Sequence, residues 1–340
     1  FIVPSPDEDE VRLEQNLNAI AAAKAAGVQH VIYPSFMKAS PTAAMGHVRI
    51  AHYPTEVAII ESGMAYTAHS RCVINATGVW VDALRQPAAP LVKASQGVHL
   101  VVSQDFMPTN TAMMIPKTRD GRVLFVVPWL GYLILGTTDT PQSAALREPS
   151  ASKADVDFIL DEAAHYLKRP PKRSDVLSIW AGLRPLVQSS STASTKSISR
   201  EHTIEMAANG LLTIVGGKWT TYRAMSEDVI LQAIAAKRLP AGTSTASVTA
   251  DLPILGADSL CNDPNLKAAA DPAFVRFAVE HEFARTVEDV LARRSRALFL
   301  NAAEAKKLAP AVMQSLIEYG LKPDDLGAFT LLTQQYQQCP

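Results

Sequence analysis

The sequence predicts an α/β protein of more than one domain, and three observations lead to this class. Short apolar segments typical of strands alternate with turns over residues 71–140. An apolar strand at residues 211–215 runs through two glycines into a helix that we expect to end near Ala236. Further along, residues 274–296 and 302–319 show helical patterns. With 340 residues, of which 48% are apolar, the chain can bury a large core.

Composition excludes several functional classes. The formal net charge is -1 and no basic stripe stands out, so we expect no nucleic-acid partner. Cys72, Cys261 and Cys339 are scattered and form no C-x-x-C pair, which indicates a reducing compartment rather than a disulfide framework. No apolar run approaches the roughly 20 residues that a bilayer requires. The acidic residues 1–10 lack the form of a signal peptide, so we expect a cytoplasmic protein.

The remaining elements follow from local signals. Residues up to about 70 indicate a helix–strand–helix unit, in which Gly27 ends the first helix. Residues 148–167 form a helix pattern with apolar positions at Val156, Ile159 and Leu160. Residues 238–251 carry few structural signals and are predicted to be a linker.

The junction after the strand at 211–215 is the most informative motif. Gly216 and Gly217 lack a Cβ, so a flat ring or an anion can approach their backbone closely. Lys218 adds a positive charge, and Thr220 and Thr221 are candidate caps of the following helix. The N–H groups and the dipole of a helix start favour an anionic group. An ordinary structural turn is the alternative, because glycine pairs are common between strands and helices.

Five more segments accompany this junction in a fixed order. Four are predicted strands, at residues 71–81, 96–102, 123–129 and 132–139, and the first of these ends in a turn of small residues. The fifth, residues 180–186, is predicted to be a tight segment and carries a single arginine. Together the segments resemble the flavin-dependent glycerol-3-phosphate dehydrogenases, which are amino-acid-oxidase-like flavoproteins. The resemblance covers about residues 70–310, closely as far as 251. It implies an FAD-binding parallel sheet and a mixed antiparallel substrate domain within 70–250, and a C-terminal helical domain at 251–340.

The beginning of the chain departs from that family. Its members open with a G-x-G-x-x-G turn that holds the FAD pyrophosphate, whereas the first glycines here are Gly27, Gly46 and Gly63. The FAD-binding sheet is therefore expected to be incomplete. Residues 1–67, including His52 and Glu56, resemble part of an NmrA-like atypical short-chain dehydrogenase, and 1–69 is the first predicted domain. A fusion near residues 66–71, a gene-model error and a fragment all remain open.

The resemblance assigns three catalytic candidates. Arg184 is the expected substrate anchor, because a guanidinium binds phosphate oxygens in a bidentate fork. Lys218 is expected beside the flavin and the substrate, where it steadies negative charge. His99 aligns with a histidine close to the substrate and is a candidate acceptor of the hydroxyl proton. For each of the three an ordinary structural or surface position is the alternative, and for His99 we weigh the two equally.

The resemblance also implies which residues bind FAD. These are Asn75, Ala76, Thr77, Gly78, Gly216, Gly217, Lys218, Trp219, Thr220 and Thr221. Thr137, Thr138 and Asp139 are expected to order a strand near the ring, in a purely structural role. Tyr222 and Arg223 are expected to pack along the helix.

The implied reaction is the FAD-dependent oxidation of sn-glycerol 3-phosphate to dihydroxyacetone phosphate, with quinone as the electron acceptor. We expect activity to be impaired by the missing pyrophosphate turn. Peripheral contact with the cytoplasmic face of a membrane and a homodimer are left open. The arginines at 285, 293, 294 and 296 could meet anionic lipid, but neighbouring carboxylates favour a solvated helix face. His281 lacks a second histidine at helical spacing, so no metal is expected.

Two other functions compete with this interpretation. Residues before Thr67 allow an NAD(P)-binding NmrA-like reductase or redox sensor, which lacks its own phosphate turn. A non-catalytic fragment or interaction module is the second alternative. Bound-flavin absorbance would favour the flavoenzyme, and NADPH-dependent fluorescence would favour the reductase. The absence of both signals would favour the non-catalytic fragment.

Overall fold

The computed structural model describes residues 9–28, 53–62, 70–85, 89–188, 201–253 and 266–340. The chain divides into two compact units, Phe1–Arg71 and Cys72–Pro340. The predicted division into three domains, at 1–69, 70–250 and 251–340, stays a prediction. None of the helices in the described part of the chain combines the length and apolar character that crossing a membrane requires.

The first unit contains two described helices, α1 (Asp9–Ala25) and α2 (Tyr53–Ser62). Ile20 of α1 and Ile59 of α2 are buried in one small cluster. The Asn16 amide donates to the Thr55 hydroxyl over 3.2 Å. Gly27 follows α1 with a φ of 72°, which agrees with the predicted helix stop. The strand predicted after it lies outside the described residues.

The second unit holds all the described strands. They are β1 (Ile74–Asn75), β2 (Val92–Ser103), β3 (Met113–Ile115), β4 (Leu124–Trp129), β5 (Tyr132–Gly136), β6 (Thr140–Pro141), β7 (Ser178–Val187), β8 (His202–Met206) and β9 (Leu212–Gly216). Its α-helices are α3 (Val81–Arg85), α4 (Lys153–Ala164), α5 (Tyr222–Ala235), α6 (Pro272–Glu282), α7 (Ala297–Leu300), α8 (Ala302–Glu318) and α9 (Leu326–Gln337). Shorter 3-10 helices are η2 (Gly78–Trp80), η3 (Gln104–Phe106), η4 (Arg173–Asp175), η6 (Trp219–Thr221) and η7 (Leu266–Ala270), and η8 (Asp289–Arg294) is a π-helix.

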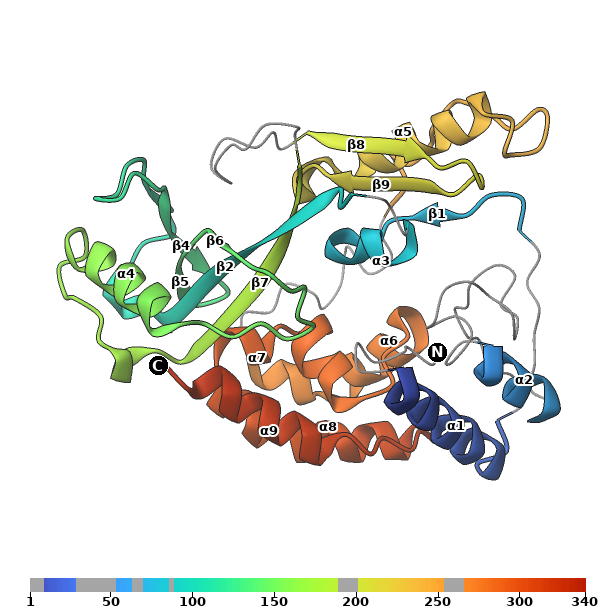
Figure 1. Cartoon of the computed structure of the whole chain (residues 1–340). Coiled ribbons are helices and arrows are strands. Elements are labelled where there is room, and N and C mark those ends of the chain that lie inside the picture. The colour runs from blue at the N-terminus through green and yellow to red at the C-terminus, as the bar shows by residue number, and fades with distance from the viewer. Residues whose placement is uncertain (1–8, 29–52, 63–69, 86–88, 189–200, 254–265) are drawn as a thin grey trace. The chain divides into compact units, whose positions relative to one another are not determined.

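An antiparallel sheet forms the centre of this unit. Its strand order is β3-β4-β5-β2-β6, and β7 pairs with the other edge of β2 along ten residues (Figure 1). Side chains alternate between the two faces of a strand. Val98, Leu100 and Val102 of β2 therefore share one face, and they are buried in a cluster with Val156 and Ile159 of α4. This packing confirms the helix pattern predicted over 148–167.

The opposite face of the sheet meets the C-terminal helices. Their own core includes Leu291, Leu298 and Leu316, and Tyr132 and Trp180 of the sheet pack against it. Figure 1 shows α7 and α9 beside the lower end of β7. The Ser178 hydroxyl at the start of β7 donates to the Leu298 carbonyl over 2.8 Å, which joins the sheet to α7.

A smaller sheet has the order β1-β9-β8. β1 and β9 are parallel, with Ile74 opposite Leu212, whereas β9 and β8 are antiparallel. Val229 and Ala233 of α5 pack against this sheet. The α/β class, the mixed and antiparallel sheets and the C-terminal helices are thus confirmed. The parallel sheet expected from the sequence is, in the described residues, a three-stranded mixed one.

Two local predictions need correction. Residues 71–81 were expected to form a strand that ends in a turn, but β1 has only two residues. The Asn75 side chain explains the early end, because its amide donates to the Val81 carbonyl and its oxygen accepts the Thr77 hydroxyl. Residues 180–186 were expected to form a tight segment, and they belong to the ten-residue strand β7. Helix α9 had no counterpart among the predicted elements.

Candidate functional site

The pairing of β2 with β7 brings two of the three catalytic candidates onto one face of the sheet. Ser95 lies opposite Arg184 and His99 lies opposite Trp180. Because side chains repeat every two residues, Arg184 and Trp180 project from the same face of β7. Four residues of strand separate their Cα atoms by about 13 Å. A cation and an imidazole therefore stand at the two ends of a short stretch of one sheet face, in which Gly97 is buried and Gly182 is exposed.

The segment that follows β5 fixes the guanidinium of Arg184 by hydrogen bonds and a nearby carboxylate. Its Nη1 donates to the Thr138 carbonyl over 3.1 Å, and its Nη2 donates to the Thr137 hydroxyl over 3.0 Å. The Asp139 carboxylate lies 3.8 Å from Nη1 and also accepts the Ser95 hydroxyl. The Arg184 side chain is 33% exposed. These contacts aim the guanidinium, so the expected ordering role of Thr137, Thr138 and Asp139 acts on Arg184.

The guanidinium lies directly over Gly97. A Cβ built on that glycine would stand 2.4 Å from Nη2, well inside a van der Waals contact. Gly182, which faces Gly97 across the ladder, has no atom within 4 Å of such a Cβ. The two glycines place no side chain between Arg184 and Trp180. The guanidinium covers Gly97, whereas the space beside Gly182 is open.

His99 is enclosed between neighbouring strands. Its ring stacks on Trp180, with the centroids 4.1 Å apart and the planes inclined by 19°. A Cβ on Gly136 would stand 2.5 Å from His99 Cδ2, so only glycine fits on that side. Burial, and secondarily the charge of Arg184, lowers the pKa of His99 from 6.5 to about 4. The imidazole is therefore neutral at physiological pH, as a proton acceptor must be.

Two buried nitrogens near this face have no partner among the described residues. They are His99 Nδ1 and Trp180 Nε1. Buried polar atoms are nearly always hydrogen-bonded in proteins, and an exception calls for a bound molecule or a functional reason. Trp180 lies in the predicted segment 180–186, but it received no functional role from the sequence. The signal that could have found it is its register with His99, which requires knowledge of the strand pairing.

The turn after β9 has the predicted course, but its glycines are required for a different reason. Gly216 and Gly217 have φ values of 81° and 72°, which other residues rarely adopt. A Cβ on Gly216 would meet the Glu201 carbonyl at 2.7 Å, and one on Gly217 would meet the Met225 sulfur at 2.5 Å. A Cβ at either position would thus clash with other atoms of the chain, and the predicted contact of these glycines with FAD stays a prediction.

The start of the following helix is open to solvent. Lys218, Thr220 and Thr221 are exposed, and Trp219 is 85% exposed and stacks on Tyr222. Thr221 occupies the cap position of α5 without a capping hydrogen bond, and its hydroxyl donates back to the Lys218 carbonyl. The predicted caps are therefore wrong: Thr221 makes no capping bond, and α5 begins at Tyr222, after the 3-10 turn η6 that contains Thr220.

The two predicted cofactor segments meet at the same edge of the small sheet. Since β1 and β9 are parallel, the segment after Asn75 and the turn after Val215 both leave at the carboxyl edge, where ligands of α/β sheets gather. Ala76 and Thr77 are exposed there. Asn75 is buried, and its amide also lies within 3.4 Å of the Thr213 hydroxyl. Asn75 therefore holds the turn together, and its predicted contact with FAD stays a prediction.

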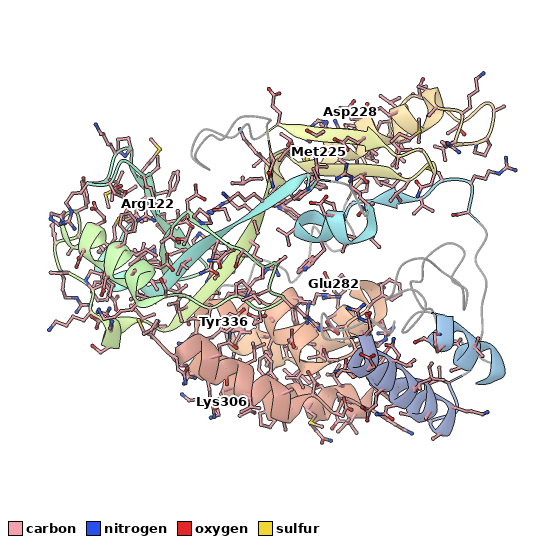
Figure 2. The ribbon with its side chains drawn as sticks, viewed as in Figure 1. Arg122, Met225, Asp228, Glu282, Lys306 and Tyr336 are labelled. Carbon is pink, nitrogen blue, oxygen red and sulfur yellow. The ribbon has the colours of Figure 1, made fainter. Side chains whose placement is uncertain are left out.

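Helix α5 is fastened to β8 and β9 beside this turn. The ring Nε2 of His202 lies 2.7 Å from the Asp228 carboxylate, and His202 faces Gly216 across the ladder. Figure 2 shows Asp228 and Met225 on α5, next to β8 and β9. His202 received no role from the sequence, because the pairing of β8 with β9 cannot be seen in the local pattern.

Strand β7 links the two groups of candidate residues. The Val187 methyl group would lie 2.9 Å from a Cβ on Gly216, so the end of β7 abuts the glycine turn. Arg184 stands three residues earlier on the same strand, about 10 Å away along it. The structure thus groups Arg184 with His99 on the large sheet and groups Lys218 with the cofactor segments on the small one.

The arginines of the C-terminal helical part are engaged by carboxylates and carbonyls. Arg293 pairs with Glu288 and Asp289, and Arg294 lies 3.8 Å from Glu282. Arg296 donates to the Arg293 carbonyl. These contacts agree with a solvated helix face. Over the described residues, no three His, Cys, Asp or Glu side chains gather in a way that could hold a metal ion.

The family comparisons agree with this geometry. Residues 21–223 match the family described as FAD dependent oxidoreductase, and residues 212–320 match the C-terminal domain of alpha-glycerophosphate oxidase. The resemblance of residues 1–67 to NmrA-like proteins finds no support in these matches, because the first of them begins inside that segment.

Similar proteins point the same way. The human mitochondrial glycerol-3-phosphate dehydrogenase is 33% identical over 308 residues, with 74% of this chain and 41% of the human protein covered. A mitochondrial glycerol-3-phosphate dehydrogenase of Arabidopsis thaliana is 40% identical over 200 residues, covering 57% of this chain and 31% of the plant protein. The chain therefore spans less than half the length of these relatives.

A solved structure shows the same fold. The glycerol-3-phosphate dehydrogenase of Bacillus halodurans, complexed with FAD, superposes with a TM-score of 0.63 at 25% sequence identity. The match covers 82% of this chain and 65% of the bacterial one. With residues 21–223 matched and the strands arranged as described, the chain belongs to the FAD-dependent oxidoreductase family.

Proposed function

We propose that this chain takes part in the FAD-dependent oxidation of sn-glycerol 3-phosphate to dihydroxyacetone phosphate. The observation that carries the proposal is the shared face of β2 and β7, on which an oriented guanidinium and a neutral imidazole stand together. Curated relatives and a solved structure that bear the name glycerol-3-phosphate dehydrogenase support the substrate class. Because the chain spans 41% of the human relative, the activity is proposed for the protein of which these residues form a part.

The residues present fit a bound FAD. The exposed residues at the start of η6 and the positive charge of Lys218 suit an anionic ring system. Ala76 and Thr77 would meet the same molecule from the neighbouring strand end. The unpaired nitrogens of His99 and Trp180 would gain partners from a ligand on that face. When bound, FAD accepts the hydride from carbon 2 of the alcohol, and we propose quinone as the final electron acceptor.

Each candidate residue then has a defined task. Arg184 binds the phosphate of the substrate, and Thr137 and Thr138 keep the guanidinium in place. His99 takes the proton of the hydroxyl at carbon 2 as the hydride leaves, so the alcohol becomes a ketone. Lys218 stabilises the negative charge that develops on the cofactor. We propose these roles on the basis of the geometry and the family.

Arg184→Lys tests the substrate role. Lysine keeps the charge but loses the fork that contacts phosphate, and a lost charge-assisted hydrogen bond of about 1.5–3 kcal/mol corresponds to a roughly 10–100-fold rise in KM. Flavin content, read from absorbance after purification, should stay at the parent level. Steady-state kinetics with glycerol 3-phosphate provide the measurement.

Arg122→Lys is the matched control. Figure 2 shows Arg122 near α4, and its guanidinium lies over the ring of Phe158, which packs with Val98 and Leu100 rather than with His99. Its substitution should leave KM unchanged. Equal KM values for parent and Arg184→Lys would contradict the role of Arg184 as substrate anchor.

Spectroscopy of the purified protein distinguishes the alternative functions. A protein with no flavin absorbance but with an NADPH-dependent fluorescence change would favour the reductase. The absence of both signals would favour a non-catalytic fragment.

A further inference from the structure

Four aromatic rings form a continuous column from the candidate site into the C-terminal helices. His99 stacks on Trp180, and Trp180 meets Phe299 of α7 edge to face, with centroids 5.5 Å apart and planes at 89°. Phe299 meets Tyr336 of α9 in the same manner at 5.7 Å and 76°. The Tyr336 hydroxyl donates to Glu148 over 2.7 Å. We refer to His99, Trp180, Phe299 and Tyr336 as the aromatic column.

The column explains how the imidazole is confined. Gly136 blocks one side of the His99 ring and Trp180 covers another. Trp180 is itself half-buried against the core of the C-terminal helices, and its Nε1 forms no hydrogen bond within the described residues. Edge-to-face and stacked contacts, rather than hydrogen bonds, therefore fix the plane of the indole, and aromatic pairs of this geometry are stabilising.

We propose that Phe299 and Trp180 are positioning residues, through which the packing of α7 and α9 sets the orientation and the water-free surroundings of the His99 imidazole. Phe299 touches no candidate ligand group, and its effect on the site passes through Trp180. The inference deepens the proposed function, because it rests on His99 as the proton acceptor. It assigns the C-terminal helices a part in the proton transfer.

The charged groups around the column are consistent with this role. Arg184 on β7 is the charge that acts on His99, and Asp139 lies beyond the Arg184 guanidinium, at 3.8 Å from Nη1. Toward the C-terminal helices, His99 is covered by the uncharged ring of Trp180, behind which lies the uncharged ring of Phe299. The first ionisable group further along is Tyr336, whose pKa is raised by burial and by its bond to Glu148. Burial is the larger cause of the lowered pKa of His99, and the column provides part of it.

A conservative substitution that opens a small cavity in the aromatic column tests the proposal. Phe299→Leu removes the ring that supports Trp180 while keeping an apolar side chain. We expect water to reach the imidazole and the pKa of His99 to rise by about one unit, because desolvation disfavours the charged form. In kinetics with glycerol 3-phosphate, the acid limb of the pH profile of kcat should shift to higher pH by a similar amount. KM should change less than twofold, since the contacts of Arg184 are untouched.

The pKa of His99 is measured directly by NMR titration of protein with isotope-labelled histidine, and His99→Gln assigns the signal. This reading requires only folded protein, so it remains valid if the chain does not oxidise glycerol 3-phosphate. A failure of the proposed function is thus distinguished from a failure of the inference. Phe299→Tyr keeps the ring and should retain the parent titration and kinetics.

Phe277→Leu is the matched control. Phe277 of α6 also contacts a histidine, His281, with centroids 4.8 Å apart, but it lies outside the column. Its substitution should leave the pKa of His99 and the acid limb unchanged. If Phe299→Leu does not fold, Phe299→Met is measured in its place. An unchanged His99 titration in the Phe299 variant, or an equal shift in Phe277→Leu, overturns the proposal.

Discussion

Arg184 illustrates how the scaffold aims a flexible side chain. Thr137 and Thr138 bind its terminal nitrogens, Asp139 balances its charge, and Gly97 provides the surface on which it lies. A surface arginine would be free to sample many rotamers, at a cost of up to about 2 kcal/mol when a ligand orders it. Preorganisation removes part of that cost before the substrate arrives.

Gly97→Ala should displace the guanidinium without unfolding the sheet. The new Cβ would stand 2.4 Å from Nη2, and the far end of an arginine can move aside more easily than backbone. We expect KM for glycerol 3-phosphate to rise about tenfold, because roughly one charge-assisted hydrogen bond is lost or misaligned. The melting temperature should fall only slightly. Steady-state kinetics and thermal unfolding measure the two effects.

Gly182→Ala is the control on the neighbouring strand. Nothing lies within 4 Å of a Cβ at Gly182, so Arg184 keeps its contacts in this variant. The difference between the two variants isolates the effect of moving the guanidinium. Similar KM values for Gly97→Ala and Gly182→Ala would contradict the interpretation of Gly97 as the support of Arg184.

At the level of elements, the sequence predicts the regular structures well. The strands over 96–102, 123–129 and 132–139 contain the cores of β2, β4 and β5, and the junction after β9 follows the predicted course. Periodicity and turn residues suffice to locate these elements because alternation and turn chemistry are local properties of the sequence, even though the strands pair with distant ones. Helix α9 had no predicted counterpart, although its buried residues Phe329, Thr333 and Tyr336 recur with helical spacing.

The site is only partly predictable from the sequence. Arg184 and His99 were named from the motifs, but Ser95, Trp180 and His202 gained their partners from strand pairing, between residues far apart in the chain. Gly216 and Gly217 were named because a missing Cβ allows close approach, whereas their positive φ values and the nearby atoms of Met225 and Glu201 come from the structure. Non-local packing of this kind leaves no signature in a local pattern.

The glycine turn can be tested as an element. Gly217→Ala combines a φ of 72° with a Cβ that would lie 2.5 Å from the Met225 sulfur. We expect a loss of about 1–3 kcal/mol in the free energy of unfolding, since both backbone strain and overpacking contribute. Flavin retained after gel filtration should also fall. Chemical denaturation and absorbance provide the measurements.

Gly242→Ala separates the two contributions. Gly242 has a φ of 84°, yet nothing lies within 4 Å of its added Cβ. This control carries the backbone strain alone, so its destabilisation should be smaller and its flavin retention unchanged. If the two variants lose the same stability, the contact with Met225 has no role in fixing the turn.

On the scale of the whole molecule, the two compact units should respond independently to damage. Leu298 is 1% exposed in the core of the C-terminal helices. Leu298→Ala should lower the free energy of unfolding of the unit that contains it by about 2–5 kcal/mol, because a cavity forms. Hydrogen exchange of amides in α8 should accelerate, while exchange in α1 should keep the parent rate.

Ile59→Ala is the reciprocal variant. Ile59 is 5% exposed in the small core that joins α1 to α2. Its substitution should accelerate exchange in α1 and leave α8 unchanged. Faster exchange in both helices for either variant would show that the units unfold as one.

Strand β7 fixes the spacing between three residues that contact different parts of the protein. Trp180, Arg184 and Val187 occupy fixed steps along it, and each step reaches a different neighbour. Because consecutive side chains point to opposite sides, inserting or deleting one residue between Trp180 and Arg184 would turn one of these two side chains toward the side of the sheet that carries α4. We therefore expect a change of length within β7 to disrupt the site more than one in the segment 165–172, which connects α4 to η4.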